Sequence, residues 1–447
     1  MKKWMSRFWL ACSIPCGLNL IFLWSQRTGY IFVMLLLTLL LSGNLLRIIF
    51  LPIRDKAGTG LRVRIMMGGR RLVYCGLYAM AAQAMVFYFI YLKKHMVHDP
   101  GLGILASNAV FACIGCFLLL AAGVLRIFFT SRRLSILRRV IMVLVMWIPV
   151  VNLIVLLYAC RLVYEEYDFE REKAQLRVLR IDSEICRTKY PLVMVHGIGF
   201  RDLRYFNYWG RIPRELMRNG AVVYYGNQEA LGTIVYNAED IRKKIFQVLS
   251  ETGCEKVNII AHSKGGLDAR YAISKLEMEP YVASLTTMNT PHRGCRFVDY
   301  ACRLPDGLYR FVASCFDHTF SMFGDKNPDF YTATRQFSTT ESQRFNEDVK
   351  DAPQVYYQSY TSRMKHPWSH LLLSIPYCMI RPLEGENDGL VSVSSAKWGE
   401  FKGVFSNART RGISHGDIID LKREDYKGFD VVETYVQIVK GLKEMGF

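Results

Sequence analysis

The first 160 residues of this chain contain almost no acidic side chains. They hold 18 of the 57 Lys and Arg residues but only 2 of the 39 Asp and Glu residues, Asp55 and Asp99, so their net charge is +16. The remaining residues carry a net charge of only +2. The basic residues of the first part lie between long apolar runs, where Lys and Arg are typical of cytoplasmic loops. Because a nucleic-acid site needs a basic patch on a folded domain, this pattern argues against nucleic-acid binding.

Other signals are missing as well. The twelve cysteines divide equally between the apolar and the hydrophilic half, and their spacing in the hydrophilic half fits no metal site. No ionisable residue lies near the middle of an apolar run, which argues against a proton relay or a transporter. The first run lacks an A-x-A-like cleavage site and four more runs follow it. We therefore expect an uncleaved helix there and not a signal peptide.

Apolar runs dominate the first part of the chain, at residues 8–24, 30–51, 72–92, 102–129 and 140–159. Each approaches or exceeds the roughly 20 residues that cross a bilayer as a helix. Helix is also the state that satisfies the backbone groups of such a run in lipid. We therefore predict an all-α transmembrane domain of about five spans at 1–160. A charged juxtamembrane helix or linker at 161–188 would connect it to a second domain at 189–447.

The basic residues mark one side of the predicted spans. The N-terminus and two alternate connections hold thirteen of them, which are Lys2, Lys3, Arg7, Arg54, Lys56, Arg62, Arg64, Arg70, Arg71, Arg132, Arg133, Arg138 and Arg139. The other connections hold only Arg27, Lys93 and Lys94. The positive-inside rule then places the N-terminus in the cytoplasm. Five crossings would place everything after Arg161 outside, which predicts an integral protein of a bacterial plasma membrane with an extracytoplasmic C-terminal domain.

The pattern changes after residue 190 to short apolar runs that alternate with amphipathic segments. Strand-like runs lie at 192–196, 221–225, 256–261, 281–289 and 354–361, and helix-like segments at 209–218, 238–252, 265–275 and 429–443. Alternating strands and helices predict a mostly parallel sheet with helices on both faces, which is the α/β class.

A serine stands between one of these strands and the next helix, in the segment AHSKGG (261–266). A nucleophile elbow is a tight strand-to-helix turn that exposes a serine hydroxyl. It needs small residues two positions before and after the serine, because the two backbones approach closely there. Ala261 and Gly265 meet this requirement, so we predict Ser263 as a nucleophile.

A serine hydroxyl needs a base that takes its proton, and a histidine oriented by a carboxylate can be that base. In this type of fold the acid precedes the histidine along the chain. Asp388 and His415 follow Ser263 in that order, both in loop-like segments. We therefore predict that these three residues are catalytic.

Other residues compete for these roles. Glu384 and Glu386 lie close to Asp388 in the sequence and could orient the histidine instead, but we favour Asp388. His262 and His292 lie before the predicted acid, so we expect structural hydrogen bonds from them.

Acyl transfer also needs donors for the negative charge that develops on the carbonyl oxygen. One is the backbone N–H after the nucleophile, at Lys264, and the other lies in the turn after the first strand, at Ile198. The residues expected to support the elbow and this turn are His196, Gly197, Gly199, His262 and Gly265. The side chain of Lys264 is expected to face solvent at the start of its helix.

With these residues assigned, the segment 190–440 resembles the bacterial triacylglycerol lipases of the α/β-hydrolase fold. The resemblance rests on the motifs YPLVMVHGIG (190–199), YWG (208–210), AHSKGG (261–266), TPHRG (290–294), RFN (344–346), NDGLV (387–391) and SH (414–415). It implies an α/β-hydrolase domain with a Ser-Asp-His triad and covers nothing before residue 160.

Some lipases of this kind bind a structural calcium through an Asp two residues after the histidine, where this chain has Asp417. No clear second Asp lies upstream of Glu384. The resemblance therefore implies no required cofactor and leaves a structural calcium at Asp417 as an expectation.

An insertion at about 302–350 carries an apolar face. Its apolar residues are Leu308, Phe311, Val312, Phe316, Phe320, Met322 and Phe323. Long insertions in compact domains are often functional, so this face would suit either a lid over an acyl pocket or an ordinary cap helix.

These observations favour a membrane-anchored hydrolase that cleaves carboxylic esters of lipids through an acyl-enzyme. Its expected partners are a lipid or ester substrate and the bilayer, and no pattern in the sequence sets the oligomeric state. An acyltransferase, or a deacylase of lipids or glycolipids, is the alternative on the same fold. A membrane receptor or transporter with an inactive hydrolase domain is a third hypothesis, against which the intact Ser263, Asp388 and His415 argue.

Overall fold

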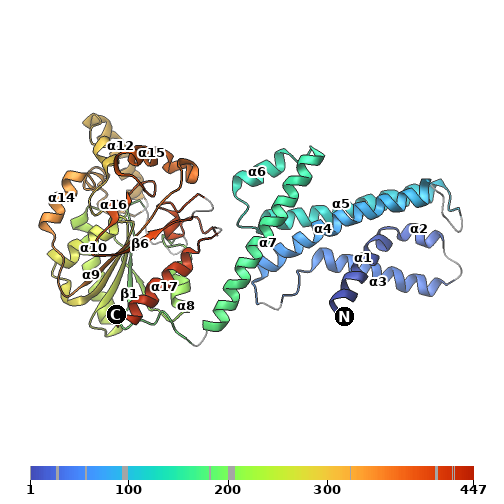
Figure 1. Cartoon of the computed structure of the whole chain (residues 1–447), viewed down its shortest axis with the longest axis horizontal. Helices are drawn as coiled ribbons and strands as arrows, with labels where there is room; N and C mark the ends of the chain where they lie inside the picture. Colours follow the sequence, from blue (N-terminus) through green and yellow to red (C-terminus); the bar gives the residue numbers. More distant parts are fainter. Residues whose placement is uncertain are drawn as a thin grey trace. The chain divides into compact units, whose positions relative to one another are not determined.

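The computed structural model divides the chain into two compact units, Met1–Leu179 and Arg180–Phe447, whose helices and strands are labelled in Figure 1. The structure describes residues 2–26, 30–55, 58–92, 99–180, 183–199, 207–322, 324–407, 411–424, 426 and 428–447. Residues that were used above but lie outside the described ranges are Arg27, Lys56, Lys93, Lys94 and Phe323.

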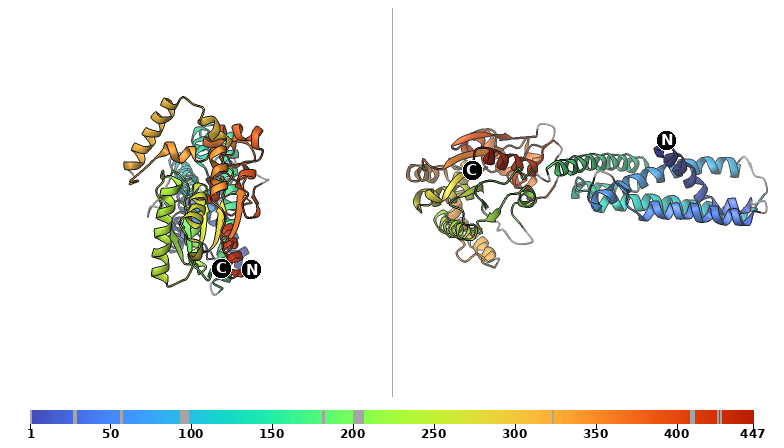
Figure 2. Two further views of the ribbon diagram at one scale, coloured as in Figure 1. Left: turned by 90° about the vertical axis from the view of Figure 1, so that its left-hand side faces the viewer. Right: turned by 90° about the horizontal axis from the view of Figure 1, so that it is seen from below.

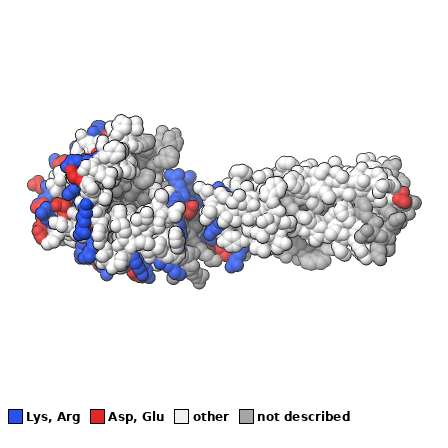
Figure 3. Space-filling model, turned by 90° about the horizontal axis from the view of Figure 1, so that it is seen from above, with Lys and Arg blue, Asp and Glu red and all other residues white. Residues whose placement is uncertain are grey.

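The N-terminal unit is helical. Its helices are α1 (Lys2–Leu18), α2 (Leu20–Ser25), α3 (Ile31–Phe50), α4 (Leu61–Phe87) with the π-helical turn η1 (Tyr88–Leu92), α5 (Leu102–Thr130), α6 (Ile136–Leu144) and α7 (Pro149–Arg180). Within the described residues, three stretches are long and apolar enough to cross a membrane, namely α3, Leu61–Ile90 and α5. Figure 3 shows that this unit exposes few charged side chains along most of its length. The first part of the chain could therefore span a membrane.

The first apolar run is interrupted at Asn19, which separates α1 from α2. The Asn19 side chain donates to Gln83 Oε1 at 2.9 Å and accepts from Asn108 Nδ2 at 2.8 Å. All three amides are buried, and a polar group away from water needs such partners. The apolar helical stretch before this break, Phe8–Leu18, is shorter than the three candidate spans.

The fifth expected span is not one helix. Its residues divide between α6 and α7, with a turn at 145–148. Met142 of α6 and Leu156 of α7 share a buried cluster with Ile127, close to the end of α5. The two helices form a hairpin beside α5, as the ribbon of this unit shows in Figure 1. The prediction of a single spanning helix at 140–159 is therefore wrong, because the chain turns back inside that run.

Glu166 of α7 lies beside the segment between α5 and α6, where the hairpin begins. Its buried carboxylate accepts hydrogen bonds from Ser131 Oγ at 2.7 Å and from the backbone N–H groups of Arg132 and Arg133, directly after the end of α5. It also pairs with Arg62, in the first turn of α4, at 2.5 Å. The hairpin thus begins and ends at the same end of the bundle. We call this end of the bundle, where Arg62, Arg132 and Arg133 surround Glu166, the basic end.

The C-terminal unit contains a six-stranded sheet with the strand order β2-β1-β3-β4-β5-β6, in which neighbouring strands are parallel. The strands are β1 (Leu192–Val195), β2 (Val223–Tyr225), β3 (Val257–His262), β4 (Val282–Met288), β5 (Tyr356–Ser362) and β6 (Glu400–Phe405). The predicted α/β class with a parallel sheet is confirmed. The chain reverses its direction across the sheet between β1 and β3, and ligands of such sheets bind at the carboxyl ends of the strands near that reversal.

Helices cover both faces of this sheet (Figures 1 and 2). Leu192 and Met194 of β1 point into the core under α8 (Ile212–Arg218) and α17 (Val431–Glu444). Val193 and Val195 point into the opposite core, under α9 (Ile234–Thr252) and α10 (Lys264–Lys275). Side chains alternate between the two faces of a strand, so a strand that is buried on both sides must be apolar throughout.

The remaining helices lie in the connections between these elements. They are η2 (Glu279–Tyr281), α11 (Arg296–Ala301), α12 (Asp306–Met322), α13 (Phe330–Arg335), α14 (Thr339–Asp348), η3 (Pro367–Ser369), η4 (Leu371–Leu373), α15 (Ser374–Glu384), α16 (Val393–Ala396) and η5 (Asp417–Ile419). Helices α12 to α14 form the insertion that the sequence analysis placed at about 302–350.

Replacing Glu166 with Gln should loosen the basic end of the N-terminal unit. The change keeps the size of the side chain but removes the charge that holds Arg62 and two backbone N–H groups, and a hydrogen bond to a charged group contributes about 1.5–3 kcal/mol. Limited trypsin digestion of the full chain in detergent should cut faster after Arg132 and Arg133. Glu172→Gln, at an exposed position on the same helix, is the control, and equal rates for both variants and the wild type would refute the expectation.

Candidate active site

Ser263 lies in the sharp turn between β3 and α10. Its backbone has φ 54° and ψ −129°, a conformation that a residue with a side chain rarely adopts. Two backbones touch beside it, because a Cβ on Gly265 would lie 2.4 Å from His196 O. At Gly266 a Cβ would lie 2.2 Å from the side-chain atom Thr290 Oγ1. The contact with backbone requires glycine at residue 265, and the turn has the geometry of a nucleophile elbow.

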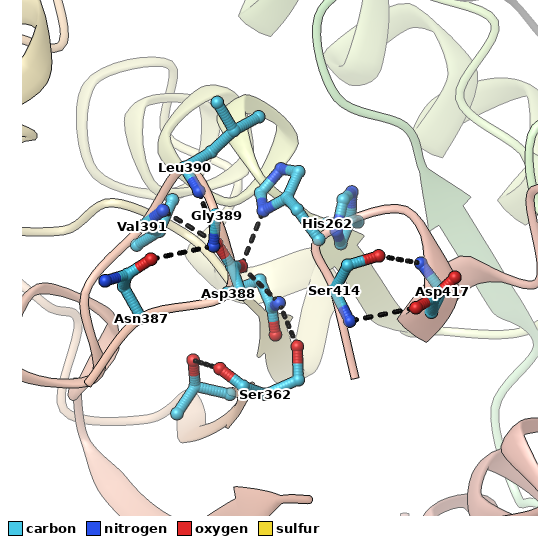
Figure 4. Close-up of polar contacts among 12 residues, drawn as sticks. His262, Ser362, Asn387, Asp388, Gly389, Leu390, Val391, Ser414 and Asp417 are labelled. Atoms are coloured by element: carbon cyan, nitrogen blue, oxygen red, sulfur yellow. Dashed lines mark hydrogen bonds and ion pairs between the residues drawn. The ribbon is translucent and has the colours of Figure 1, made fainter. Parts of the chain in front are cut away.

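The two other predicted catalytic residues form a direct pair. Asp388 Oδ2 lies 2.7 Å from His415 Nδ1, and the backbone N–H of His415 donates to Asp388 O at 2.9 Å. Asp388 is fully buried, and its Oδ1 accepts from the backbone N–H groups of Leu390 and Val391 at 2.8 and 2.7 Å. Figure 4 shows these contacts converging on Asp388. The carboxylate is thus held in one orientation toward the imidazole.

Asn289 also contacts this carboxylate, and the sequence analysis did not identify it. Its Nδ2 donates to Asp388 Oδ2 at 2.5 Å and to Ser362 Oγ at 2.7 Å. It follows β4 directly and has φ 50°, a region that asparagine tolerates better than most residues. The available signal was an asparagine at the carboxyl end of the strand that follows the nucleophile's strand, both along the chain and in the sheet.

The competing acids are engaged elsewhere. Glu386 pairs with Arg363, and Glu384 accepts from the backbone N–H of Arg296 at 2.9 Å and from Ser392 Oγ. The carboxylate at the ring of His415 is that of Asp388.

His262, the last residue of β3, directly precedes Ser263 and packs against His415. Its ring centroid is 4.5 Å from that of His415, and its Nδ1 lies 2.6 Å from the hydroxyl of Tyr208. Burial lowers the pKa of His262 well below its usual value, and a positive charge on His415 lowers it further. A neutral His262 therefore packs against the predicted base.

His292 is a second buried histidine. Its ring stacks on Trp398 at 5.1 Å, and its two nitrogens lie near Thr287 Oγ1 (3.1 Å) and Arg270 (3.4 Å). Burial lowers the pKa of His292 well below its usual value, and the charges of Arg270 and Arg293 lower it further. Both His262 and His292 are thus hydrogen-bonded to neighbouring side chains.

The turn after β1 lies against the elbow. A Cβ on Gly197 would be 2.8 Å from Ser263 Cβ, so this turn touches the predicted nucleophile. The two ring nitrogens of His196 lie 2.7 and 2.9 Å from the carbonyl oxygens of Gly197 and Gln228, which fixes the ring. Ile198, the predicted donor, lines the same cavity as Ser263.

The side chain of Lys264 does not face solvent, contrary to the expectation above. It is 1% exposed, and its Nζ lies 2.6 Å from Asp268 Oδ1 one helical turn later. Asn237 donates to the other carboxylate oxygen at 3.2 Å. Burial raises the pKa of Asp268 to about 6, although the charge of Lys264 and its hydrogen bond oppose that shift. The pair anchors α10 to α9 directly behind the elbow.

An apolar cavity of about 680 Å³ adjoins Ser263 and His415. Its other walls come mainly from the loop after β1, from helices α11 to α13 and from the loop that contains Leu390 and Val391. The inward residues of α12 are Leu308, Tyr309, Val312, Phe316 and Phe320, whereas Phe311 and Met322 are mostly exposed. The insertion therefore covers the cavity with part of its apolar face.

The surroundings of Asp417 do not fit a calcium ion. One carboxylate oxygen accepts from Tyr426 at 2.7 Å and from the guanidinium of Arg411 at 3.3 Å, and the other accepts from the backbone N–H of Ser414 at 3.1 Å. These donors and a positive charge occupy the positions that a cation would need. In the part of the chain that the structure describes, no group of three or more His, Cys, Asp or Glu residues could hold a metal ion.

Comparisons with known proteins point to ester hydrolases. Residues 190–305 match the family described as "Putative serine esterase (DUF676)". Triacylglycerol lipase 2 of Saccharomyces cerevisiae is 27% identical over 274 residues, which are 56% of this chain and 77% of that protein. The triacylglycerol lipases of Pseudarthrobacter phenanthrenivorans and Burkholderia plantarii are 33% identical over 178 residues, which are 37% of this chain. The chain spans 55% and 49%, about half, of the length of those two bacterial lipases.

Solved structures give a weaker match. The mature form of the Bacillus licheniformis lipase BlEst2 is 19% identical with a TM-score of 0.42, and the match covers 56% of this chain and 92% of that one. The metagenomic carboxyl esterase MGS0156 is 16% identical with a TM-score of 0.44, over 57% and 76% of the two chains. With the sequence matches and the parallel sheet described above, the C-terminal unit is a lipase- or esterase-like serine hydrolase domain of the α/β-hydrolase fold.

The stability of this unit should depend on the two buried histidines. Because their pKa values are lowered in the folded state, the unfolded chain binds more protons below about pH 6.5, and stability falls as the pH falls. Each histidine contributes at most about 1.4 kcal/mol per pH unit. His292→Asn should therefore show a shallower loss of the urea midpoint of the full chain in detergent between about pH 6.5 and 5. His318→Asn, at an exposed position on α12, should keep the wild-type slope; an unchanged slope in the His292 variant would argue against a neutral buried imidazole.

Proposed function

We propose that this chain is a membrane-bound serine hydrolase that cleaves carboxylic esters with apolar acyl chains. The observation that carries the proposal is the placement of Ser263 and the Asp388–His415 pair at one apolar cavity of about 680 Å³. A cavity of that size with few polar groups suits an acyl chain, since ligand pockets are mostly apolar with a small number of placed polar groups.

The chemistry begins with the hydroxyl of Ser263, which is a weak nucleophile until its proton is removed. In the proposed reaction its Oγ attacks the ester carbonyl while His415 Nε2 takes the proton. Asp388 holds the Nδ1–H of the ring and stabilises the imidazolium that forms. The backbone N–H groups of Ile198 and Lys264 would donate to the developing oxyanion, and loss of one such donor typically costs about 10²–10³ in rate.

The second half of the reaction releases the acyl group. His415 returns its proton to the leaving alcohol, and water then attacks the acyl-Ser263 ester with His415 as the base. The same intermediate could pass its acyl group to another alcohol, so an acyltransferase differs only in the acceptor. A product assay with labelled acyl donor in the presence of lipid alcohols separates the two outcomes: free acid indicates hydrolysis and a new ester indicates transfer.

Exposed apolar side chains near the cavity support a substrate drawn from a lipid phase. Helix α15 packs against α11, whose residues line the cavity. The residues just before and within α15, Trp368, Leu371, Leu372 and Ile375, are 78%, 76%, 83% and 72% exposed. Large apolar patches on a protein surface are typical of contacts with membranes, ligands or partners.

Ser263→Ala should abolish hydrolysis of a medium-chain p-nitrophenyl ester by the purified full chain. Removal of the nucleophile in such a triad lowers kcat by about 10⁶-fold, to the background level. Asp388→Asn should lower kcat by about 10⁴-fold, because it favours the wrong tautomer of the base. Ser250→Ala, at an exposed position on α9, should keep full activity. Comparable turnover by the Ser263 variant and the wild type would rule out the proposed mechanism.

The charges and the hairpin support a proposal for how the chain lies in the membrane. Residues at the basic end include Arg62, Arg132 and Arg133, and the positive-inside rule assigns such an end to the cytoplasmic side. The hairpin of α6 and α7 starts and finishes there, so it adds no crossing. The C-terminal unit would then lie on the cytoplasmic side, together with the N-terminus if α1 and α2 cross once. The extracytoplasmic placement expected above depended on a fifth crossing.

The hairpin turn presents apolar side chains and bonds part of its own backbone. Val145 N donates to Ile141 O and Ile148 N to Val145 O, both at 3.0 Å. Asn152 Nδ2 donates to Met146 O at 3.1 Å. Trp147 is 81% exposed, and a tryptophan at such a turn suits contact with the lipid surface.

Reporter fusions test this orientation in a Gram-negative host. Green fluorescent protein fused after Phe447 should fluoresce, and alkaline phosphatase at the same point should be inactive, because the C-terminus stays in the cytoplasm. The same reporters fused after Pro100, in the connection between α4 and α5, should give the opposite pattern. An active phosphatase after Phe447 would place the C-terminus outside the cytoplasm. That result would contradict the proposed orientation and would support a fifth crossing.

A further inference from the structure

A second cavity, of about 260 Å³, lies in the N-terminal unit at the basic end. Three arginines line it: Arg47, Arg54 and Arg71. Gly68, Ile48 of α3 and apolar residues of the segment that follows α3 form the rest of its wall. Arg64 fixes this segment, since its Nε donates to Ile53 O at 3.0 Å. The cavity therefore joins a cationic side to an apolar side.

Arg47, Arg71 and Arg126 lie next to the ends of the uncharged stretches of the candidate spans. Arg47 lies in the last turn of α3, whose preceding residues 31–46 contain no charged side chain. Arg71 directly precedes the uncharged stretch 72–92 of α4 and η1, and Arg126 directly follows the uncharged stretch 102–125 of α5. In a bilayer this level corresponds to the lipid headgroups.

Within the part of the N-terminal unit that the structure describes, no carboxylate pairs with the positive charges at this cavity. Among the described residues, Arg47, Arg54, Arg71 and Arg126 form no ion pair with a carboxylate. Asp55, next to Arg54 in the chain, is instead bound by Thr59 Oγ1 at 2.5 Å and by the hydroxyl of Tyr167 at 3.2 Å.

Arg126 adds an unsatisfied donor at the cavity wall. Its Nη2 donates to Ile49 O, but its Nη1 is buried and has no hydrogen-bond partner among the described residues. A Cβ on Gly68, which lines the cavity, would lie 3.0 Å from this Nη1. The absence of a side chain at residue 68 therefore leaves room for the nitrogen at the wall. A buried donor without a partner costs free energy unless a ligand satisfies it.

We propose that this cavity binds the phosphate group of an anionic phospholipid. Guanidinium groups match phosphate oxygens with paired, charge-assisted hydrogen bonds, and basic pockets between membrane helices are suited to such headgroups. Free phosphate shares this chemistry but has no use for the apolar wall, which fits the glycerol and the start of the acyl chains. The proposal rests on the membrane placement above and not on the esterase reaction.

The test is a binding titration of the full chain in a neutral detergent. The ligands are ether-linked phosphatidylglycerol, ether-linked phosphatidylcholine and inorganic phosphate. Ether lipids contain no carboxylic ester, so the result is independent of any hydrolysis by Ser263. The variant R47Q/R71Q removes two charges from the cavity, and R138Q/R161Q removes two charges from exposed positions near the same end. Native mass spectrometry or a thermal shift reports the binding.

Phosphatidylglycerol should bind the wild type and the control variant alike, and at least about tenfold more weakly to R47Q/R71Q, since one hydrogen bond to a charged group is worth that much. Gly68→Ala should also weaken binding without changing the charge, and it carries the test if the double variant aggregates. Unchanged binding to the cavity variants, or an equal loss in the control, overturns the site. Binding of phosphate as tight as that of the lipid, or equal binding of phosphatidylcholine, overturns the assignment to an anionic phospholipid.

Discussion

Two backbones touch beside Ser263, and the geometry of the site depends on that contact. The start of α10 can approach the end of β1 because residue 265 has no side chain: a Cβ there would lie 2.4 Å from His196 O. The approach holds Ser263 at φ 54°, a conformation with a free-energy cost that the surrounding packing must offset. It also presses the turn that contains Ile198 against the serine. The predicted nucleophile and the predicted oxyanion donor are thus positioned by the same close contact at the carboxyl end of the sheet.

Buried carboxylates organise both units in the same physical way. Asp388 accepts two backbone N–H bonds and the amide of Asn289, and this leaves one orientation in which it meets His415. Glu166 accepts backbone N–H groups after α5 and a guanidinium, and this fixes where the α6–α7 hairpin returns. A buried charge persists only when several donors surround it. In the C-terminal unit, the buried Asp388 orients the imidazole of His415. In the N-terminal unit, the buried Glu166 holds α7 against the segment that follows α5.

The sequence was sufficient for features that depend on local patterns. The apolar strands β1, β3 and β4 and the small residues around Ser263 follow from burial on both faces and from the elbow geometry. Strand β6 was not predicted, because it lies at the edge of the sheet and carries Glu400 and Lys402. The buried Lys264 was also missed, although Asp268 one helical turn later was a readable signal. Apolar composition alone cannot distinguish a span from a hairpin, and the proline that starts α7 was the only local sign of the turn in the fifth run.

The chain thus combines a hydrolase domain with a helical unit that could span a membrane, and α7 leads from one unit to the other. The activation of Ser263 by His415 is tested most directly by labelling the full chain with a fluorophosphonate and locating the adduct by peptide mass spectrometry. We expect an adduct on Ser263 in the wild type and its loss in His415→Ala. An adduct on another residue, or labelling of Ser263 that does not depend on His415, would contradict it.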